Sequence, residues 1–382
     1  MYSVSNYGQM IADTPRTEAY VTALRRTVEP DSVVVDLGCG PGLFALLACQ
    51  MGARRVYAIE PDNVIEVARQ AAAANGYEDR IEFIQEYSTR VTLPEKADVI
   101  ISDLRGVLPL FQQHIPAMAD ARCRLLKPGG VLIPQKDFLW ATVVEAPEIY
   151  AKISGPWELH NYGLDLNSAR RFVINDWRKL RVNPEQFLTE PLHWCVLDYR
   201  EVEDPDVTAE LRWDASRPGL AHGFIMWFDT ELFDGIGFSN RPGEFELVYG
   251  AAFFPFLYPI DLVEEDEIGI SLKADLVGED YIWRWNTRVV SKQNSGVVKA
   301  TFKQSTFFGV PLSAPQLHKK SASHVASLND EGAIEIFILS LMDGKTTLEQ
   351  IANQLTEKYP NRFASYRNAL DHVSEIAQEF TE

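Results

Sequence analysis

The sequence is poor in cysteine and has no long apolar run. Its 382 residues contain four scattered cysteines, without a CxxC pair or a Cys/His cluster: Cys39, Cys49, Cys123 and Cys195. This distribution argues against a zinc site and indicates reduced thiols. No window reaches the roughly eighteen apolar residues of a membrane span, and the opening MYSVSNYGQM lacks the features of a secretory signal. We therefore expect a cytoplasmic protein without a metal or a membrane partner.

Positive charge is also scarce. There are 36 basic residues against 54 acidic ones, which gives a formal net charge of −18. Such a surface repels phosphate backbones, so we expect no nucleic-acid partner. It favours a cationic partner, for example an arginine-rich or lysine-rich segment, although the favoured explanation of the acidity is that it only aids solubility.

The chain is too long for a single core, so several domains are expected. Strands and helices alternate over residues 31–134, which predicts an α/β domain with a parallel sheet and helices on both faces. Over residues 135–312 helical periodicity nearly vanishes, and aromatic and β-branched runs predict an antiparallel β-barrel or sandwich. We also expect an N-terminal helical segment (1–30), a linker (313–323) and a small α-rich domain (324–382).

The expected strands of the parallel sheet are short and rich in β-branched residues. They are Ser32–Asp36, Arg55–Glu60, Ile81–Gln85, Asp98–Ser102 and Val131–Ile133. Helices are expected over Leu43–Met51, Asn63–Asn75 and Gln112–Leu126. The glycine pair in Lys127–Gly130 predicts a turn before the fifth strand.

A glycine-rich turn follows the first expected strand. It reads Asp36-Leu-Gly38-Cys-Gly40-Pro-Gly42 and stands at a strand–turn–helix junction. Gly38 and Gly40 allow the backbone to approach a bulky ligand, and Gly42 lets the next helix begin close to the sheet. Open α/β sheets bind ligands at this place, outside the carboxyl ends of their strands.

Two acidic residues make this motif more specific. Glu60 ends the second strand, where its carboxylate can accept both hydroxyls of an adenosine ribose. Asp36 can orient the turn and meet the amino group of the ligand. S-adenosylmethionine (SAM) has no phosphate group, so its site needs no phosphate-binding feature. We therefore expect SAM as the cofactor and S-adenosylhomocysteine (SAH) as its product. The alternatives are a nicotinamide cofactor and a purely structural βαβ unit with an acidic surface residue at position 60.

Five segments resemble the protein arginine methyltransferase family, in order, over roughly the first 310 residues. They are Tyr7–Tyr20, Leu126–Pro134, Trp157–Asp165, Phe224–Ser239 and Asp266–Gly269. The resemblance implies a class I SAM-dependent methyltransferase with a Rossmann-like domain followed by a β-barrel. It also implies a homodimer, because the family dimerises through an arm inserted in the β domain.

The same resemblance implies individual cofactor contacts. Arg16 would bind the methionine carboxylate of SAM, and a guanidinium suits this task because it meets a carboxylate with two parallel hydrogen bonds. Met10 would form a wall of the methyl site. Tyr7, Pro61 and Thr89 complete the set, with Thr89 at the family's adenine-facing glutamate position.

The sequence departs from the family at the catalytic positions. The family has two glutamates on the loop after the fourth strand, and here these positions are Asp103 and Gln112. The family's Thr-His-Trp loop corresponds to Leu247–Tyr249. Losing one carboxylate beside a fixed cation reduces the rate on the order of 100-fold or more, which disfavours arginine as the acceptor. Asp103 can still hold an ammonium, an amide or one guanidinium edge, and Asp103 and His114 are candidate bases, although a lone histidine is more often structural.

The C-terminal residues 328–352 resemble the small PqqD-like domain. An Asn-x-x-Gly start at Asn329, the turn Asp343–Thr346 and the following helix at Ile351 carry this likeness. It implies a winged-helix-like fold that binds a leader peptide along a sheet edge. The alternative is a helical cap on the β domain or a dimerisation element.

Three functional hypotheses follow. The leading one is SAM-dependent N-methylation of a peptide or protein. The second is methylation of a small molecule, such as free arginine or another amine, in a biosynthetic pathway. The third is an inactive SAM-binding or peptide-binding protein, against which the complete set of cofactor residues argues.

Overall fold

The computed structural model describes residues 3–158, 161–293 and 296–381, and it divides into two compact units, residues 1–311 and 312–382. The finer expected boundaries at residues 30 and 134 stay a prediction. Leu159 and His160, within the family-like segment Trp157–Asp165, lie outside the described residues. None of the helices in the described ranges is long and apolar enough to cross a membrane.

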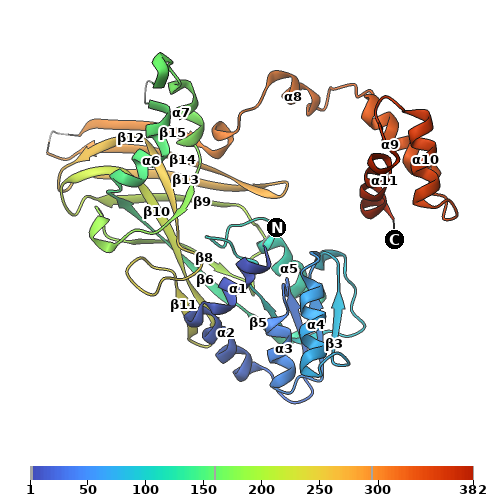
Figure 1. The fold of residues 1–382 in the computed structure, drawn as a ribbon. Helices are drawn as coiled ribbons and strands as arrows, with labels where there is room; N and C mark the ends of the chain where they lie inside the picture. Colours follow the sequence, from blue (N-terminus) through green and yellow to red (C-terminus); the bar gives the residue numbers. More distant parts are fainter. Residues whose placement is uncertain (1–2, 159–160, 294–295, 382) are drawn as a thin grey trace. The chain divides into compact units, whose positions relative to one another are not determined.

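The first unit contains the expected parallel sheet (Figure 1). Its strand order is β3-β2-β1-β4-β5, and every pairing is parallel. The strands are β1 (Val33–Leu37), β2 (Arg55–Ile59), β3 (Ile81–Ile84), β4 (Ala97–Ser102) and β5 (Leu126–Ile133). The predicted turn Lys127–Gly130 is wrong, because these residues lie inside β5, where the pairing shifts register opposite Ala97 and Val99.

Helices cover both faces of this sheet, as the strand–helix alternation predicts. Alternate strand residues, for example Val34 and Val56, pack with helices α2, α3 and α4, whereas Val33 and Val35 face the other way and pack with α5. Burial on both faces explains why β1 is almost uniformly apolar. The helices of this part are α1 (Val4–Ala12), α2 (Thr14–Thr27), α3 (Leu43–Gln50), α4 (Ile65–Asn75) and α5 (His114–Arg124).

Two antiparallel sheets follow, as expected for a barrel or sandwich. One has the order β7-β12-β10-β6-β8 with β11 paired to β10, and the other has the order β15-β14-β13-β9. The strands are β6 (Lys136–Val144), β7 (Arg178–Leu180), β8 (Leu192–Asp198), β9 (Val207–Asp214), β10 (Gly219–Phe233), β11 (Ile236–Ser239), β12 (Ala251–Leu262), β13 (Glu267–Val277), β14 (Asp280–Ser291) and β15 (Val297–Ser305). The residues between the sheets form an aromatic core that is continuous with the α5 side of the parallel sheet.

Helices interrupt the β part between β6 and β7, so the expectation that helical periodicity nearly vanishes there is wrong. The insertion contains α6 (Pro147–Glu158) and α7 (Arg170–Val173). The hydroxyl of Tyr150 ties α6 to β12 by hydrogen bonds to the carbonyls of Phe256 at 3.1 Å and Leu257 at 3.0 Å. The insertion is short and partly exposed, and this is why its apolar periodicity is weak.

The second unit is helical. It contains α8 (Ala314–Lys319), α9 (Asp330–Leu341), α10 (Leu348–Lys358) and α11 (Tyr366–Phe380), so the expected linker holds a short helix. Apolar residues of the last three helices, including Ile338, Leu355 and Val373, form a core of their own. Within described residues 312–381 there is no strand, so the small α-rich domain is present but the wing and sheet edge of the expected winged-helix-like fold are not.

The β core should be sensitive to truncation at Phe254. This fully buried ring contacts the rings of Phe224, Trp283 and Trp285. We expect Phe254→Ala to lower the free energy of unfolding by about 3–5 kcal/mol. Phe245→Ala is the control, because Phe245 is 73% exposed and its loss should change stability little. Urea unfolding, followed by circular dichroism, measures both, and equal midpoints would contradict this packing.

Candidate active site

A cavity of about 1060 Å³ lies at the carboxyl ends of β1, β2 and β4, within the first unit. Cavities of this size hold small molecules and cofactors. It brings together ten of the residues singled out from the sequence: Tyr7, Met10, Arg16, Gly38, Glu60, Pro61, Thr89, Asp103, Gln112 and His114. The cavity therefore extends from the predicted ribose ligand to the predicted catalytic loop.

The carboxylate of Glu60 is held in place by backbone amides. Its Oε2 accepts a hydrogen bond from Gly40 N and its Oε1 accepts one from Asp62 N, both at 3.0 Å. Burial raises the pKa of Glu60, whose residue exposure is 7%. Each carboxylate oxygen retains a lone pair, so the two hydroxyls of a ribose fit as further donors. This arrangement agrees with the expected binding of an adenosine.

Three predicted cofactor-binding residues, Asp36, Gly40 and Gly42, are not among the residues that line the cavity. Asp36 is 1% exposed, and its Oδ2 accepts a hydrogen bond from Ala45 N at 2.9 Å, which fixes the first turn of α3. Gly42 has a φ of 83°, and a Cβ there would stand 2.7 Å from the Cβ of Ala68 on α4. The glycine is thus required for close helix packing, as predicted.

Asp103 follows β4 and has only 8% of its side chain exposed. Its Oδ2 accepts hydrogen bonds from Arg16 Nε at 2.8 Å, from the Tyr249 hydroxyl at 2.6 Å and from Arg16 Nη2. Its Oδ1 accepts one from Arg105 Nε at 3.1 Å. Burial alone raises the pKa of Asp103, but Arg16 and Arg105 outweigh it and hold the pKa at about 2.

Arg105 connects Asp103 to the β part of the unit. Its side chain and that of Asp137 are both 0% exposed. Nη1 of Arg105 donates to Asp137 Oδ1 at 2.8 Å and to Thr230 Oγ1 at 2.7 Å, and Nη2 donates to the Tyr20 hydroxyl. Hydrogen bonds to four side chains therefore hold the Arg105 guanidinium in place: those of Asp103, Asp137, Thr230 and Tyr20.

The other two candidate catalytic residues differ in position. His114 is 1% exposed, and its Nε2 lies 2.9 Å from the hydroxyl of Tyr199. Burial, assisted by the charge of Arg105, lowers the pKa of His114 to about 3, so its imidazole is neutral. Gln112 lines the cavity and is exposed, with a φ of 42°. Its carboxamide carries no charge that could replace the family's second glutamate.

Sequence reasoning assigned no role to several residues that shape this site. Arg105 stands two positions after Asp103 on the loop that follows β4, and a basic residue so close to a predicted catalytic carboxylate could have been recognised as its partner. Tyr249 stands at the position of the family's tryptophan, and its hydroxyl binds both Asp103 and Arg16. Lys179 and Glu279 also line the cavity, and no local pattern marks them because β7 and the turn after β13 approach only in the folded chain.

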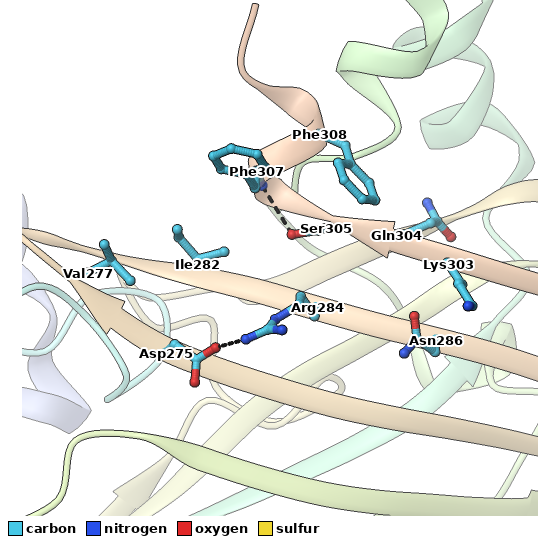
Figure 2. Close-up of a pocket in the computed structure, with 10 residues that line it drawn as sticks. All are labelled: Asp275, Val277, Ile282, Arg284, Asn286, Lys303, Gln304, Ser305, Phe307 and Phe308. Carbon is cyan, nitrogen blue, oxygen red and sulfur yellow. Dashed lines mark hydrogen bonds and ion pairs between the residues drawn. The ribbon is translucent and has the colours of Figure 1, made fainter. Parts of the chain in front are cut away.

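A second hollow, of about 400 Å³, lies on the outer face of β13, β14 and β15 (Figure 2). The rings of Phe307 and Phe308 stand over it, and Arg284 forms an ion pair with Asp275. It contains none of the residues singled out from the sequence. Over the described part of the chain no group of three or more His, Cys, Asp or Glu could hold a metal ion.

Comparisons with known proteins agree with this geometry. Residues 13–135 match the family Ribosomal protein L11 methyltransferase (PrmA), and residues 135–270 match the Arginine methyltransferase oligomerization subdomain. Protein arginine N-methyltransferase 6 of Danio rerio is 31% identical over 244 residues, which are 59% of this chain and 68% of that protein.

The chain belongs to the protein arginine N-methyltransferase family. The family confirms the expected class, a SAM-dependent methyltransferase, and its methyl donor. The chain is 30% identical over 238 residues to Probable protein arginine N-methyltransferase 6 of Arabidopsis thaliana, covering 60% of this chain and 54% of that protein. It therefore spans about half the length of that relative.

Solved structures of the family share the fold. A Trypanosoma brucei PRMT1 enzyme–prozyme heterotetrameric complex with AdoHcy aligns with a TM-score of 0.71 and 22% identity, covering 78% of this chain and 96% of that chain. Arabidopsis thaliana protein arginine methyltransferase 10 aligns with a TM-score of 0.69 and 23% identity, covering 79% and 97%. The Rossmann-like sheet and the antiparallel sheets of this methyltransferase-family chain are thus those of the family.

Removing the Glu60 carboxylate should weaken cofactor binding. We expect Glu60→Ala to reduce the affinity for SAH by roughly 1–3 kcal/mol, because charged hydrogen bonds to the ribose are lost. Glu66→Ala is the matched control, since Glu66 lies on α4 with 58% of its side chain exposed. Isothermal titration calorimetry measures both variants. An unchanged affinity of the Glu60 variant would reject the ribose assignment.

Asp36 should make stability depend on pH. Burial, assisted by Glu60, raises the pKa of Asp36 from 3.8 to about 7. Between these values the folded protein holds a proton that the unfolded chain has lost, so the free energy of unfolding falls as pH rises. Asp36→Asn should remove this dependence, and should be more stable than the wild type at pH 7.5 by at least about 1.4 kcal/mol, the equivalent of one pKa unit.

Urea unfolding at pH 5 and pH 7.5 measures this effect. All eight tryptophans precede residue 286, so their fluorescence reports the first unit alone. If both proteins lose the same stability between the two pH values, Asp36 is not the group responsible.

Proposed function

We propose that this chain transfers a methyl group from SAM to a nitrogen atom of a peptide or protein. One observation carries the proposal: a single cavity joins Glu60, at the ribose end, to Asp103 and Tyr249, at the catalytic loop and the β part. A methyl donor and an acceptor can meet only where both are held in one water-poor space. Methyl transfer from a sulfonium is an in-line displacement that depends on such positioning.

Residues of the cavity have separable roles in this proposal. Glu60 binds the ribose, Arg16 binds the amino-acid carboxylate of SAM, and Met10 lines the methyl site. The Nε of Arg16 donates to Asp103 at 2.8 Å, Nη1 donates one N–H to the carbonyl of Met10, and Nη2 donates one N–H to Asp103. Each terminal nitrogen therefore keeps a second N–H for a ligand carboxylate. When bound, SAM supplies the methyl group on a positively charged sulfur.

The names of the relatives favour a protein acceptor. The matching family acts, by its name, on ribosomal protein L11, and the curated relatives are named protein arginine N-methyltransferases. Nothing among them favours a small-molecule acceptor. The names of the curated relatives give the arginine side chain as the acceptor.

We further propose that the chain forms a homodimer through the insertion between β6 and β7. The oligomerization subdomain matches residues 135–270, which contain this insertion. Apolar side chains are exposed on it, with Tyr162 at 100% and Leu164 at 60%. A leader peptide bound by the C-terminal unit stays a prediction, and without a strand in its described residues the helix surfaces would have to provide the contacts.

Labelled SAM tests the activity. We expect the labelled methyl group to appear in the protein fraction of a cell extract and not in the fraction of small molecules. Tyr249→Phe should lower this transfer about tenfold, the equivalent of about 1.4 kcal/mol, because Asp103 and Arg16 lose a shared hydrogen-bond partner while every charge is kept.

The control for this variant is Tyr258→Phe, whose ring is 56% exposed outside the cavity. Its transfer rate should equal that of the wild type, and both variants should bind SAH with unchanged affinity. Label confined to small molecules, or no label above background, would reject the proposed function.

A further inference from the structure

The second hollow, on the outer face of β13, β14 and β15, is separate from the catalytic cavity, and none of the described residues lines both. Its volume of about 400 Å³ is large enough for a bulky side chain of a partner. The rings of Phe307 and Phe308 stand over it and are 49% and 54% exposed (Figure 2). Val277 and Ile282 continue this apolar wall. The hollow therefore offers apolar surface to a ligand from outside.

The turn that carries the two rings is anchored, so their exposure is built into the fold. It spans Thr306–Gly309 directly after β15. The hydroxyl of Thr306 accepts a hydrogen bond from Trp283 N at 3.0 Å. The backbone at Gly309 passes so close to Asn175 that a Cβ there would stand 2.5 Å from the Asn175 carbonyl oxygen. Large apolar groups that a fixed turn presents to solvent are typical of a binding surface.

Basic side chains stand beside the hollow on the same face of the sheet. Arg284 and Lys303 line it from the neighbouring strands β14 and β15. Asp275 is the acid among its described lining residues, and it is already paired with Arg284 and with Lys273, whose Nζ lies 2.8 Å from Asp275 Oδ1. Lys303 is exposed, and none of the described carboxylates pairs with it. The charge left over at the hollow is positive.

This positive charge continues along the outer face of the sheet. Arg288 follows Arg284 by four residues on β14, so both side chains point to this face, about 13 Å apart along the strand. Gly269 on β13 separates Arg288 from Arg212 on β9, because it is paired with both. Glu210 on β9 faces the same way, so basic groups outnumber acidic ones here. On a chain with a net charge of −18 this is a local reversal of sign.

The two ends of the hollow differ in charge. Its apolar end lies at the turn between β13 and β14, where Val277 pairs with Asp280 and Glu279 is exposed. Its other end leads from Lys303 to Arg288. An occupant that suits both ends places an apolar group at the turn and its negative charges on one side of that group only.

We propose that this surface docks an acidic peptide segment of a partner protein, with a large apolar side chain in the hollow and its carboxylates along the cations. We call this surface the docking face, and its residues are Val277, Ile282, Phe307, Phe308, Arg284, Lys303, Arg288 and Arg212. A guanidinium meets a carboxylate with two parallel hydrogen bonds, and a buried apolar anchor supplies most of the affinity of such contacts. The proposal goes beyond methyl transfer, because it gives the chain a way to recruit a partner without using the catalytic cavity.

The rival ligand for a cationic face is a nucleic acid. The observations favour the peptide, because the positive charge is local and the net charge of −18 repels a long phosphate backbone. The hollow also takes a single apolar group, which an acidic peptide can supply with an aromatic or aliphatic side chain.

Fluorescently labelled peptides test the proposal with the full-length chain. Each has one anchor, phenylalanine or alanine, and a run of glutamates, serines or lysines either before or after it. Fluorescence anisotropy at low salt measures their affinity. In the better of the two orders, we expect the phenylalanine–glutamate peptide to bind at least about tenfold more tightly than the phenylalanine–serine and alanine–glutamate peptides, which corresponds to about 1.4 kcal/mol. Its affinity should fall as salt is added.

Two substitutions locate the binding on the docking face. Lys303→Glu reverses an exposed charge beside the hollow, and Phe308→Ala removes one of its rings. We expect each to weaken the phenylalanine–glutamate peptide at least about fivefold, because the first turns an attraction into a repulsion and the second removes contact with the anchor. Both side chains are exposed, so both variants should unfold at the same urea concentration as the wild type.

Lys152→Glu and Phe245→Ala are the matched controls. Lys152 is exposed on α6 and Phe245 is exposed before β12, and neither lines the hollow. They should leave the affinity for the peptide unchanged. All four variants should bind SAH as the wild type does, because none of the four residues lines the catalytic cavity.

Several results would overturn the proposal. They are equal binding of the glutamate and serine peptides, tighter binding of the lysine peptide, no binding of any peptide, or full affinity in the Lys303 and Phe308 variants. A single-stranded oligonucleotide that displaces the peptide and binds more tightly would assign the face to nucleic acid and overturn the proposal as well. Each of these measurements is independent of methyl transfer, so the proposed function is tested separately.

Discussion

One carboxylate, that of Asp103, organises this protein around its cavity. Arg16 reaches it from α2, Tyr249 from the segment before β12, and Arg105 from the same loop. Arg105 extends the contact to Asp137 on β6, so a continuous run of buried charge joins the N-terminal helices, the parallel sheet and the antiparallel sheets. Because breaking a buried pair is strongly destabilising, these parts are held in one relative position where the acceptor must bind.

The same contacts separate the chain from the pattern of its own family. The cofactor half of the cavity, with Glu60 and the glycine turn, keeps the features expected for SAM. In the acceptor half, Asp103 and Gln112 stand where the family has two glutamates, and Arg105 forms ion pairs with both Asp103 and Asp137. Family membership therefore indicates the methyl donor, whereas the acceptor is the part of the function that these differences leave to experiment. A shared fold does not fix a shared acceptor.

The sequence predicted those features that depend on local patterns. The largely apolar β1, the turn from Asp36 to Gly42 and the acid at the end of β2 are each readable within one βαβ unit. Contacts between distant segments were not readable: Arg105 meets Asp137 only because β4 and β6 converge. The helix α6 was missed because its buried face is short, with two buried residues.

A crystal structure of the full-length chain with SAH tests the central claim most directly. We predict that the guanidinium of Arg16 contacts the carboxylate of SAH, whereas Arg105 remains bonded to both Asp103 and Asp137. Asp103 would then still face the acceptor position with its charge balanced. An Arg105 side chain turned away, with Asp103 open to the cavity and free of cations, would contradict the account.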